Sequence, residues 1–309
     1  MLARTLRLSA LCAAAIAIAP APARAQPPAA CRTIRLGHGG WLDNQVQNAV
    51  FGAVVAPFGY QVRIEPARLK TIYHRLATGR LDVYLQDWRP DNWMSSVTAI
   101  RDSDVARKRI AVAGTDLSGA RHTLAVPAYL YRAGLKDFAD IHKFAGQLDH
   151  TIYGIEPDNV GDRQLLSMIR RNTDGLGGFH LVQAGAGGML RALAAKIRHH
   201  EPILFLGWQP DAMNVEYRIR YLGGGGAAFG HDQGAARSLI LTRAGYAAQC
   251  PAIGGLLHRF RLPVRAESRM MYDIQVKREA VGPVAAAWIA AHPAWLKRMR
   301  APLASPARG

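Results

Sequence analysis

The sequence contains few cysteines. Three occur in 309 residues, and Cys12 lies in an apolar N-terminal segment, which leaves Cys31 and Cys250 for the rest of the chain. Two thiols so far apart do not provide the clustered spacing of a structural zinc site. In an oxidising compartment the two would form a disulfide, and the alternative is a pair of free, buried thiols.

Long hydrophobic runs are also missing, apart from Leu8–Ala19. That run follows Arg4 and Arg7 and precedes the small-x-small sequence Ala23–Ala25, and it is shorter than the roughly 20 residues that span a bilayer. We therefore expect residues 1–25 to be a secretory signal peptide, cleaved after Ala25, and the mature chain to be a periplasmic protein. An uncleaved anchor is the alternative.

Acidic residues are scarce. The chain has 22 Asp and Glu against 39 Lys and Arg, for a formal net charge of +17. Such a surplus suits nucleic acid or an anionic membrane. The arginines are scattered, however, with only short clusters such as Arg107–Arg109, and they do not alternate with aromatic residues as in single-strand binders. We interpret most of this charge as a solvated surface and expect no nucleic-acid partner.

Motifs of catalysis are incomplete. Gly185–Gly188 lacks the last glycine of a dinucleotide fingerprint. His38–Gly40 resembles an oxyanion loop, but no G-x-S-x-G elbow accompanies it. His199–Glu201 is not the H-E-x-x-H zinc motif. The sequence therefore predicts no enzyme, no metal site and no cofactor.

Short apolar segments alternate with helical patterns. We expect strands at 33–37, 61–64 and 81–85, with helices at 43–57 and 69–78 between them. The same alternation recurs later in the chain, where we expect strands at 123–126, 151–155 and 203–207 and helices at 162–171 and 189–199. This alternation predicts an α/β fold built on a parallel sheet, with about two domains' worth of chain.

Several distinctive side chains fall just after apolar strands, namely Trp41, Trp88, Asn159 and Trp208. Ligands of open α/β sheets bind beyond those strand ends. Tryptophan faces there would attract a quaternary ammonium, which has no N–H to donate and binds to the ring quadrupole instead. For any one tryptophan, core packing is the alternative. We assign Trp288 and Trp295 to packing and leave Trp93 open.

With these tryptophans, the chain resembles the substrate-binding proteins of glycine betaine/choline ABC importers, most closely the choline-binding branch. The resemblance covers nearly all of the mature chain. Its blocks, in order, are Gly40–Asp43, Leu81–Pro90, Thr123–Pro127, Ile152–Asn159, Phe205–Pro210 with Met213–Asn214, Ala244–Tyr246 before Cys250–Pro251, and Ala287–Ile289 with His292–Pro293.

The resemblance implies a two-lobed clamshell of the type II periplasmic binding protein class, in which closure of the lobes buries the ligand. One lobe would comprise residues 31–120 plus 217–309, and the other residues 121–216. It also implies a disulfide between Cys31 and Cys250.

The resemblance further implies an aromatic cage. Trp41 and Trp88 would form its walls in one lobe and Trp208 a wall in the other. Asp43 and Asn159 would contact the ligand hydroxyl, and Asp43 would add negative charge. The expected partner is the permease and ATPase complex of an ABC importer, contacted by a monomer. A sensor module that feeds a receptor is the alternative.

One residue departs from the family pattern. His122 stands where a tyrosine wall is usual, just before Thr123–Pro127. A protonated imidazole would repel a cation, so the cage would be weaker, pH-sensitive or adapted to a ligand with a carboxylate, such as glycine betaine or carnitine. Alternatively, His122 points away and Tyr129 or Tyr131 takes its place.

Overall fold

The structure is a computed structural model that describes residues 26–89, 96–157 and 159–304. The expected signal peptide at 1–25 and Trp93 lie outside these residues. Within the described ranges, no helix has the length and apolar character needed to cross a membrane.

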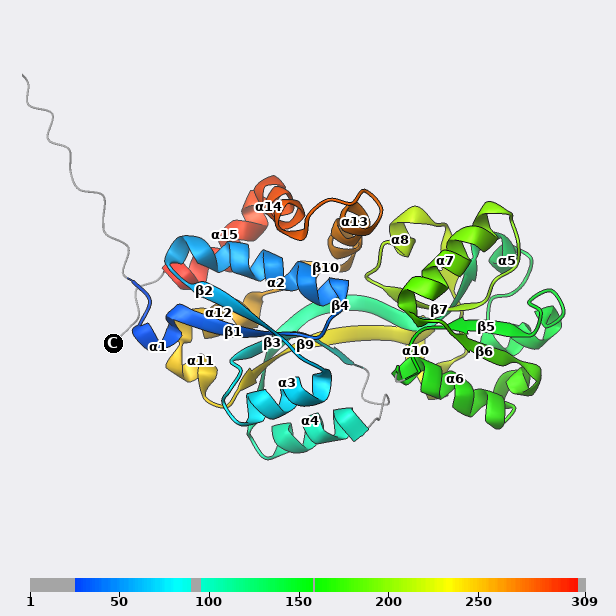
Figure 1. Ribbon diagram of the computed structural model, residues 1–309, viewed down its shortest axis with the longest axis horizontal. Helices are drawn as coiled ribbons and strands as arrows, with labels where there is room; N and C mark the ends of the chain where they lie inside the picture. The colour runs from blue at the N-terminus through cyan, green and yellow to red at the C-terminus, as the bar shows by residue number, and fades with distance from the viewer. Residues whose placement is uncertain (1–25, 90–95, 158, 305–309) are drawn as a thin grey trace, which may run out of the picture.

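In the part of the chain that the structure describes, ten strands form one sheet that runs along the molecule (Figure 1). Eight of them follow the spatial order β2 (Gln61–Pro66), β1 (Thr33–His38), β3 (Val83–Arg89), β9 (Ala235–Arg243), β4 (Ile110–Pro127), β7 (Phe205–Gln209), β5 (Thr151–Gly154) and β6 (His180–Gln183). The short strands β8 (Ile219–Tyr221) and β10 (Leu262–Pro263) both pair with β4.

The expected parallel units are present at both ends of this sheet. β1 pairs in parallel with β2 and β3, and β5 pairs in parallel with β6 and β7. Between them, β4 and β9 pair antiparallel with each other, β9 with β3 and β4 with β7. The sheet is therefore mixed, and the long strands β4 and β9 connect its two parallel parts (Figure 1).

The strand expected at 123–126 is only the end of the 18-residue strand β4. Its pairing with β9 shifts register between Val112 and Gly114 and again between Ser118 and Ala120. A side chain at Gly114 would place its Cβ only 2.6 Å from the carbonyl oxygen of Leu257, so glycine allows α12 (Pro251–Arg259) to pack directly on the strand. These irregularities let one strand serve both parts of the sheet.

Helices cover both faces of the sheet at its β1–β3 end. On one side lie α2 (Leu42–Val55), α13 (Val264–Gln275), α14 (Val281–Ala291) and α15 (Pro293–Ala304), and on the other α3 (Leu69–Ala77) and α4 (Ser96–Ala106) (Figure 1). The same end of the molecule also contains three further helices, α1 (Ala29–Arg32), α11 (Tyr246–Gln249) and α12 (Pro251–Arg259). The largest buried apolar cluster forms under α2, around Val50, Phe51 and Phe260.

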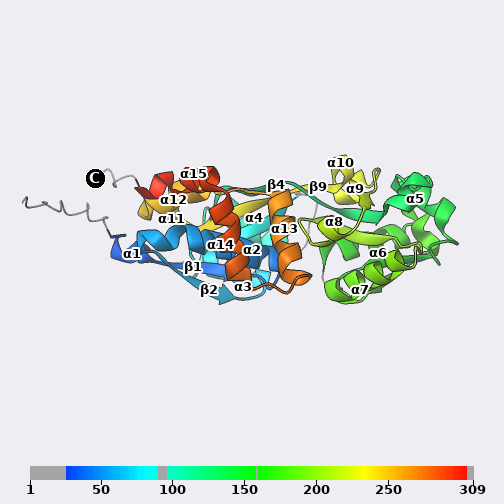
Figure 2. The same ribbon diagram turned by 90° about the horizontal axis from the view of Figure 1, so that it is seen from above.

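The β5–β7 end has its own helices and its own apolar cluster. The helices are α5 (Ala128–Arg132), α6 (Val160–Arg170), α7 (Gly185–Arg198), α8 (Met213–Glu216), α9 (Gly226–Phe229) and α10 (His231–Gly234). The cluster joins residues such as Phe138, Phe205 and Phe229. Figure 2 shows the two groups of helices side by side along the long axis. The lobe boundaries given above stay a prediction.

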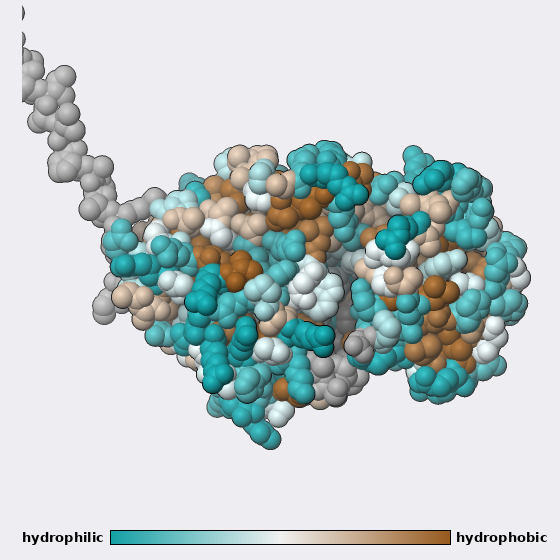
Figure 3. All heavy atoms as spheres, in the orientation of Figure 1, coloured by the Kyte–Doolittle hydropathy of each residue, from teal (hydrophilic) through white to brown (hydrophobic). Residues whose placement is uncertain are grey.

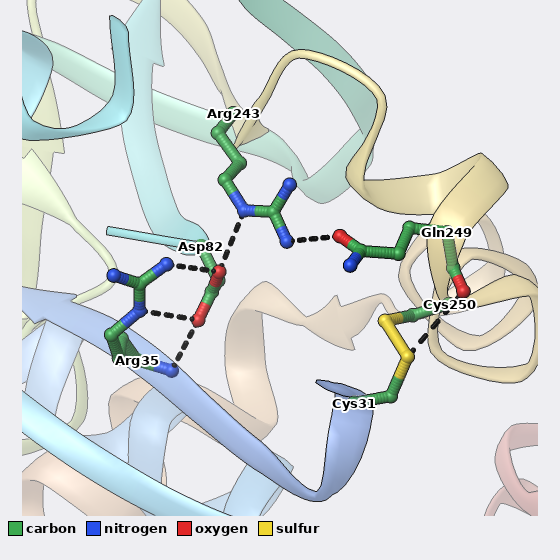
Figure 4. Close-up of a disulfide and its surroundings, with 6 residues drawn as sticks. All are labelled: Cys31, Arg35, Asp82, Arg243, Gln249 and Cys250. Carbon is green, nitrogen blue, oxygen red and sulfur yellow. Dashed lines mark hydrogen bonds and ion pairs between the residues drawn. A yellow bond between two sulfur atoms is a disulfide. The ribbon is translucent and has the colours of Figure 1, made fainter. Parts of the chain in front are cut away.

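The disulfide is present. Cys31 and Cys250 are bonded, with their Cα atoms 5.7 Å apart and a sequence separation of 219 (Figure 4). Beside them, the Asp82 carboxylate accepts hydrogen bonds from Arg35 (2.7 Å from Nη2) and Arg243 (2.8 Å from Nε). This cross-link joins the first helix to the start of α12.

Candidate functional site

Trp41 lies at the turn between β1 and α2. Its carbonyl accepts the first hydrogen bond of the helix, from the N–H of Gln45 at 3.1 Å. The indole folds back over Gly39, where an added Cβ would come within 2.5 Å of the ring, and Gly40 adopts φ of +97°. Trp41 as a whole residue is nevertheless 46 % exposed. The turn therefore presents an aromatic face at the carboxyl end of β1.

Asp43, two residues further on, is buried and directly bonded to Trp88. Its Oδ2 accepts a hydrogen bond of 3.1 Å from the indole Nε1 of Trp88, and its Oδ1 accepts one of 2.8 Å from the N–H of Asn44. Burial raises the pKa of this carboxyl, and the two hydrogen bonds oppose that rise. The hydrogen bond fixes the orientation of the indole beside the carboxylate.

The position of Trp88 depends on a bulge in β3. The pairing with β9 shifts between Tyr84 and Asp87, and Gln86 adopts φ of 65° there. Beyond the bulge, Trp88 pairs with Ser238. Its ring packs against the small cluster of Leu117, Ala120 and Ala236 on the two long strands. Val160, the first residue of α6, packs against the same cluster.

His122 and Trp208 form a second pair. They lie opposite each other on the antiparallel strands β4 and β7, so both side chains point to the same face of the sheet. His122 is buried, with its ring edge-on to Phe229 at a centroid distance of 6.2 Å. Burial lowers the pKa of His122 to about 4, so the ring is neutral at physiological pH.

Asn159 caps helix α6 next to this pair. Its Oδ1 accepts a hydrogen bond of 2.7 Å from the N–H of Gly161, and a Cβ at Gly161 would lie 2.7 Å from Cε1 of His122. The helix start is thus packed against the imidazole. Because the cap uses the side-chain oxygen, Asn159 offers its Nδ2 as a donor.

The six predicted site residues therefore fall into two groups, each on its own part of the sheet. Trp41, Asp43 and Trp88 belong to the first, and His122, Asn159 and Trp208 to the second. Trp88 and Val160 meet on the cluster at the long strands, which brings the groups toward one another. Figure 3 shows that the surface is hollowed between the two parts of the molecule.

The structure also places the two alternative tyrosines, Tyr129 and Tyr131. Tyr129 stacks on His200 with ring centroids 4.0 Å apart, and its hydroxyl donates to the carbonyl of Glu201. Tyr131 lines a cavity of about 570 Å³ that also contains Arg121 and Tyr217. A second cavity, of about 720 Å³, is lined by basic side chains of α12 and α15. Neither cavity is lined by any of the six predicted site residues.

Sequence reasoning missed three buried carboxyls, two of them near the first group and the third, Asp211, in the turn after Trp208. Glu267 of α13 accepts hydrogen bonds from Nε2 of Gln47 (3.1 Å) and of Gln86. Burial, followed by the charge of Asp43, raises the pKa of Glu267 well above its ordinary value. Burial also raises the pKa of Asp116 to about 6 and that of Asp211 to about 7.

These carboxyls differ from their neighbour Asp87, which is paired with Arg101 at 3.1 Å. In the described ranges, Asp43, Asp116, Asp211 and Glu267 form no ion pair with Lys or Arg. A buried group of acids without a cationic partner favours entry of a positive charge. No signal in the sequence marks them, since an isolated Asp or Glu is ordinarily a surface residue. Nor do the described residues contain a cluster suited to a metal ion.

Comparison with known proteins identifies the family of this chain. Residues 32–291 match the family OpuAC, the substrate binding domain of ABC-type glycine betaine transport systems. A choline-binding protein of an ABC transporter, solved in complex with choline, is 32 % identical, with a TM-score of 0.76 over 88 % of this chain and 93 % of that one. An uncharacterised protein, ORF1, of Chromohalobacter salexigens is 33 % identical over 132 residues, which is 43 % of this chain and 82 % of that one.

The lactococcal OpuAC in complex with glycine betaine has a TM-score of 0.74 at 22 % identity, over 87 % of this chain and 99 % of that one, and supports the fold alone. The expected type II periplasmic binding protein fold is confirmed. The family consists of solute-binding proteins and not of enzymes. With most of its length matched, the chain belongs to the OpuAC family of substrate-binding proteins, which serve glycine betaine and choline ABC transporters.

Proposed function

We propose that this protein captures choline, or a closely similar trimethylammonium compound, in the periplasm and delivers it to the permease of an ABC importer. The observation that carries this proposal is the Trp88–Asp43 hydrogen bond of 3.1 Å, set beside buried carboxyls that lack a cationic partner. The choline complex of the relative at 32 % identity supports the same ligand class.

In this proposal the ammonium lies against Trp41, Trp88 and Trp208. Each aromatic face contributes about 0.5–2 kcal/mol to the binding free energy, and the contribution is larger when water is excluded. Asp43 supplies the opposite charge and accepts the ligand hydroxyl, while Nδ2 of Asn159 donates to the same hydroxyl. Such a site needs both groups of residues, so closure of the two proposed lobes would complete it.

A neutral His122 is compatible with this cage. Its pKa of about 4 keeps the imidazole uncharged in the periplasmic pH range, so it would not repel an ammonium. The ring lies on the same face as Trp208, from the strand beside it. We propose that it supplies a small aromatic face where relatives have a larger one.

Calorimetric titration of the chain from residue 26 onward, refolded free of bound ligand, tests the proposal. Choline, glycine betaine, carnitine and acetylcholine would be titrated at pH 7.5. One-to-one binding of choline in the micromolar range or tighter, with a weaker response to the carboxylated ligands, supports it. A preference for glycine betaine or carnitine would assign the site to that class. Absence of binding by all four would contradict the proposal.

A further inference from the structure

Asp211 occupies a fixed position relative to Trp208. It follows the cis peptide bond Gln209–Pro210 and is only 1 % exposed. Nδ2 of Asn214 donates hydrogen bonds to the carbonyls of both Trp208 (2.8 Å) and Asp211 (3.2 Å). Tyr221 in turn donates from its hydroxyl to Oδ1 of Asn214, at 2.7 Å. The amide of Asn214 therefore holds the tryptophan and the aspartate in one rigid turn.

The negative charge of the Asp211 carboxylate has few stabilising partners. Its Oδ1 accepts a hydrogen bond of 2.9 Å from the N–H of Met213. The charged groups that act on it are Asp43 and Glu216, and both are acids. After burial, the charge of Asp211 also helps to raise the pKa of Tyr221. Among the described residues, no Lys or Arg forms an ion pair with Asp211.

Asp43 and Asp211 belong to different groups of site residues, and after burial the charge of Asp43 helps to raise the pKa of Asp211. Asp43 belongs to α2 and is bonded to Trp88, whereas Asp211 belongs to the turn after Trp208. Helix α8, which begins two residues after Asp211, packs against α13, and α13 carries the buried Glu267. Two buried carboxylates thus belong to opposite parts of the protein, and each lies in a segment that carries a site tryptophan or is bonded to one.

We propose that Asp211 is a specificity-determining residue that, together with Asp43, makes the site accept cations with a neutral hydroxyl arm and reject those that carry a carboxylate. The inference rests on the proposed function. A ligand carboxylate would stand between two fixed negative charges in a region of low dielectric, where like charges repel strongly and salt screens little. Specificity here arises from repulsion of the wrong ligand as well as attraction of the right one.

Paired titrations of choline and glycine betaine test this inference. At pH 8, Asp211→Asn keeps an oxygen for the Met213 N–H but removes the charge. We expect it to weaken choline binding and strengthen glycine betaine binding, so that the ratio of the two affinities falls on the order of tenfold or more. Asp174→Asn is the matched control, because it makes the same replacement at an exposed acid, and it should leave the ratio within about twofold of wild type.

A second variant and a second measurement keep the inference testable if Asp211→Asn does not fold. Asp211→Ser retains a short acceptor for the turn and should shift the ratio in the same direction. In the wild type, the preference for choline should decline from pH 8 to pH 6, whereas in Asp211→Asn this decline should be smaller. An unchanged ratio in both folded variants would overturn the inference. If the wild type bound neither ligand, the proposed function itself would fail.

Discussion

The indole Nε1 of Trp88 donates a hydrogen bond of 3.1 Å to Oδ2 of Asp43, across 45 positions of sequence. The bond orients an aromatic wall and partly satisfies a buried carboxylate. The donor N–H lies on the edge of the ring, so this bond does not itself use the π face of the indole. One contact thus couples the two attractions that a quaternary ammonium needs, a π face and a negative charge.

Removing the Trp88 ring should weaken choline binding sharply. We expect Trp88→Ala to raise the dissociation constant by about tenfold to a hundredfold, because a wall and the partner of Asp43 are lost together. Trp88→Phe, which retains a face but no N–H, should lose less. Calorimetry measures both. Trp288→Ala, at a ring that stacks on His292 in the C-terminal helices, is the control and should bind normally. Equal affinities for Trp88→Ala and wild type would rule out the cage.

Choline affinity should rise with pH. In the ligand-free protein, burial raises the pKa of Asp211 to about 7 and also raises that of Asp43. A bound cation favours the ionised carboxylates, so binding releases protons, and affinity falls as the pH drops through the raised pKa values. We expect a loss of roughly tenfold between pH 8 and pH 6. Titrations in two buffers of different ionisation enthalpy would count the protons released. An affinity that increased on acidification would contradict the sign of this linkage.

His122 should contribute nothing to that pH dependence. Because burial lowers its pKa to about 4, the ring carries no charge between pH 5 and pH 8, and the behaviour expected of a histidine titrating near 6.5 does not apply. His122→Phe removes the ionisable group and keeps an aromatic face. We expect its choline affinity to follow the same pH curve as the wild type. Loss of the curve in this variant would assign the titration to the imidazole.

Much of the architecture was predictable from local patterns. The strands expected at 33–37, 61–64 and 81–85 correspond to β1, β2 and β3, and the intervening helices to α2 and α3. These segments are predictable because apolar periodicity is a local property of the chain. The first 13 residues of β4, by contrast, are rich in Gly, Ala and polar residues, and their conformation follows from pairing with β9, more than 100 residues away.

The site was predictable only in part. The resemblance identified Asp43, Trp88 and the disulfide, and the structure brings the first two into contact. It did not identify Glu267, whose burial arises when α13 packs on α2, 220 residues from Gln47. A carboxylate becomes part of such a cluster through tertiary packing, which leaves no mark on its neighbours in sequence.

Loss of the disulfide should destabilise the fold and spare the ligand site. The Cys31–Cys250 bond closes a loop of 219 residues, for which the chain-entropy model gives a stabilisation of roughly 5 kcal/mol at most. We expect Cys31→Ser with Cys250→Ser to lower the urea midpoint clearly, with choline affinity within about twofold of the wild type at 25 °C. Reduction of the wild type with dithiothreitol should have the same effect. The double-serine variant is the control, because dithiothreitol should not change its urea midpoint. An unchanged midpoint would mean that the cross-link adds no stability.

Replacing Glu267 with glutamine should stabilise the protein at neutral and alkaline pH. Burial raises the pKa of Glu267 well above 4.5, so the unfolded chain loses this proton at a lower pH than the folded chain does. The residue therefore costs stability as the pH rises through its unfolded pKa, and the cost stops growing above the folded pKa. A neutral amide removes that cost, and its NH₂ group can donate to Oε1 of Gln47 or Gln86, both of which are buried without a hydrogen-bond partner in the described ranges.

We expect Glu267→Gln to raise the free energy of unfolding by about 1–3 kcal/mol at pH 8, with the gain shrinking toward pH 4, where the unfolded state is also protonated. Urea denaturation across this pH range measures the difference. Glu279→Gln is a matched control, because Glu279 is exposed near the end of α13 and should change stability by less than about 0.5 kcal/mol. A lower stability of Glu267→Gln at pH 8 would show that the ionised carboxylate is held favourably in the fold. The buried acids would then be satisfied without a ligand, and the electrostatic basis for capturing a cation would be weakened.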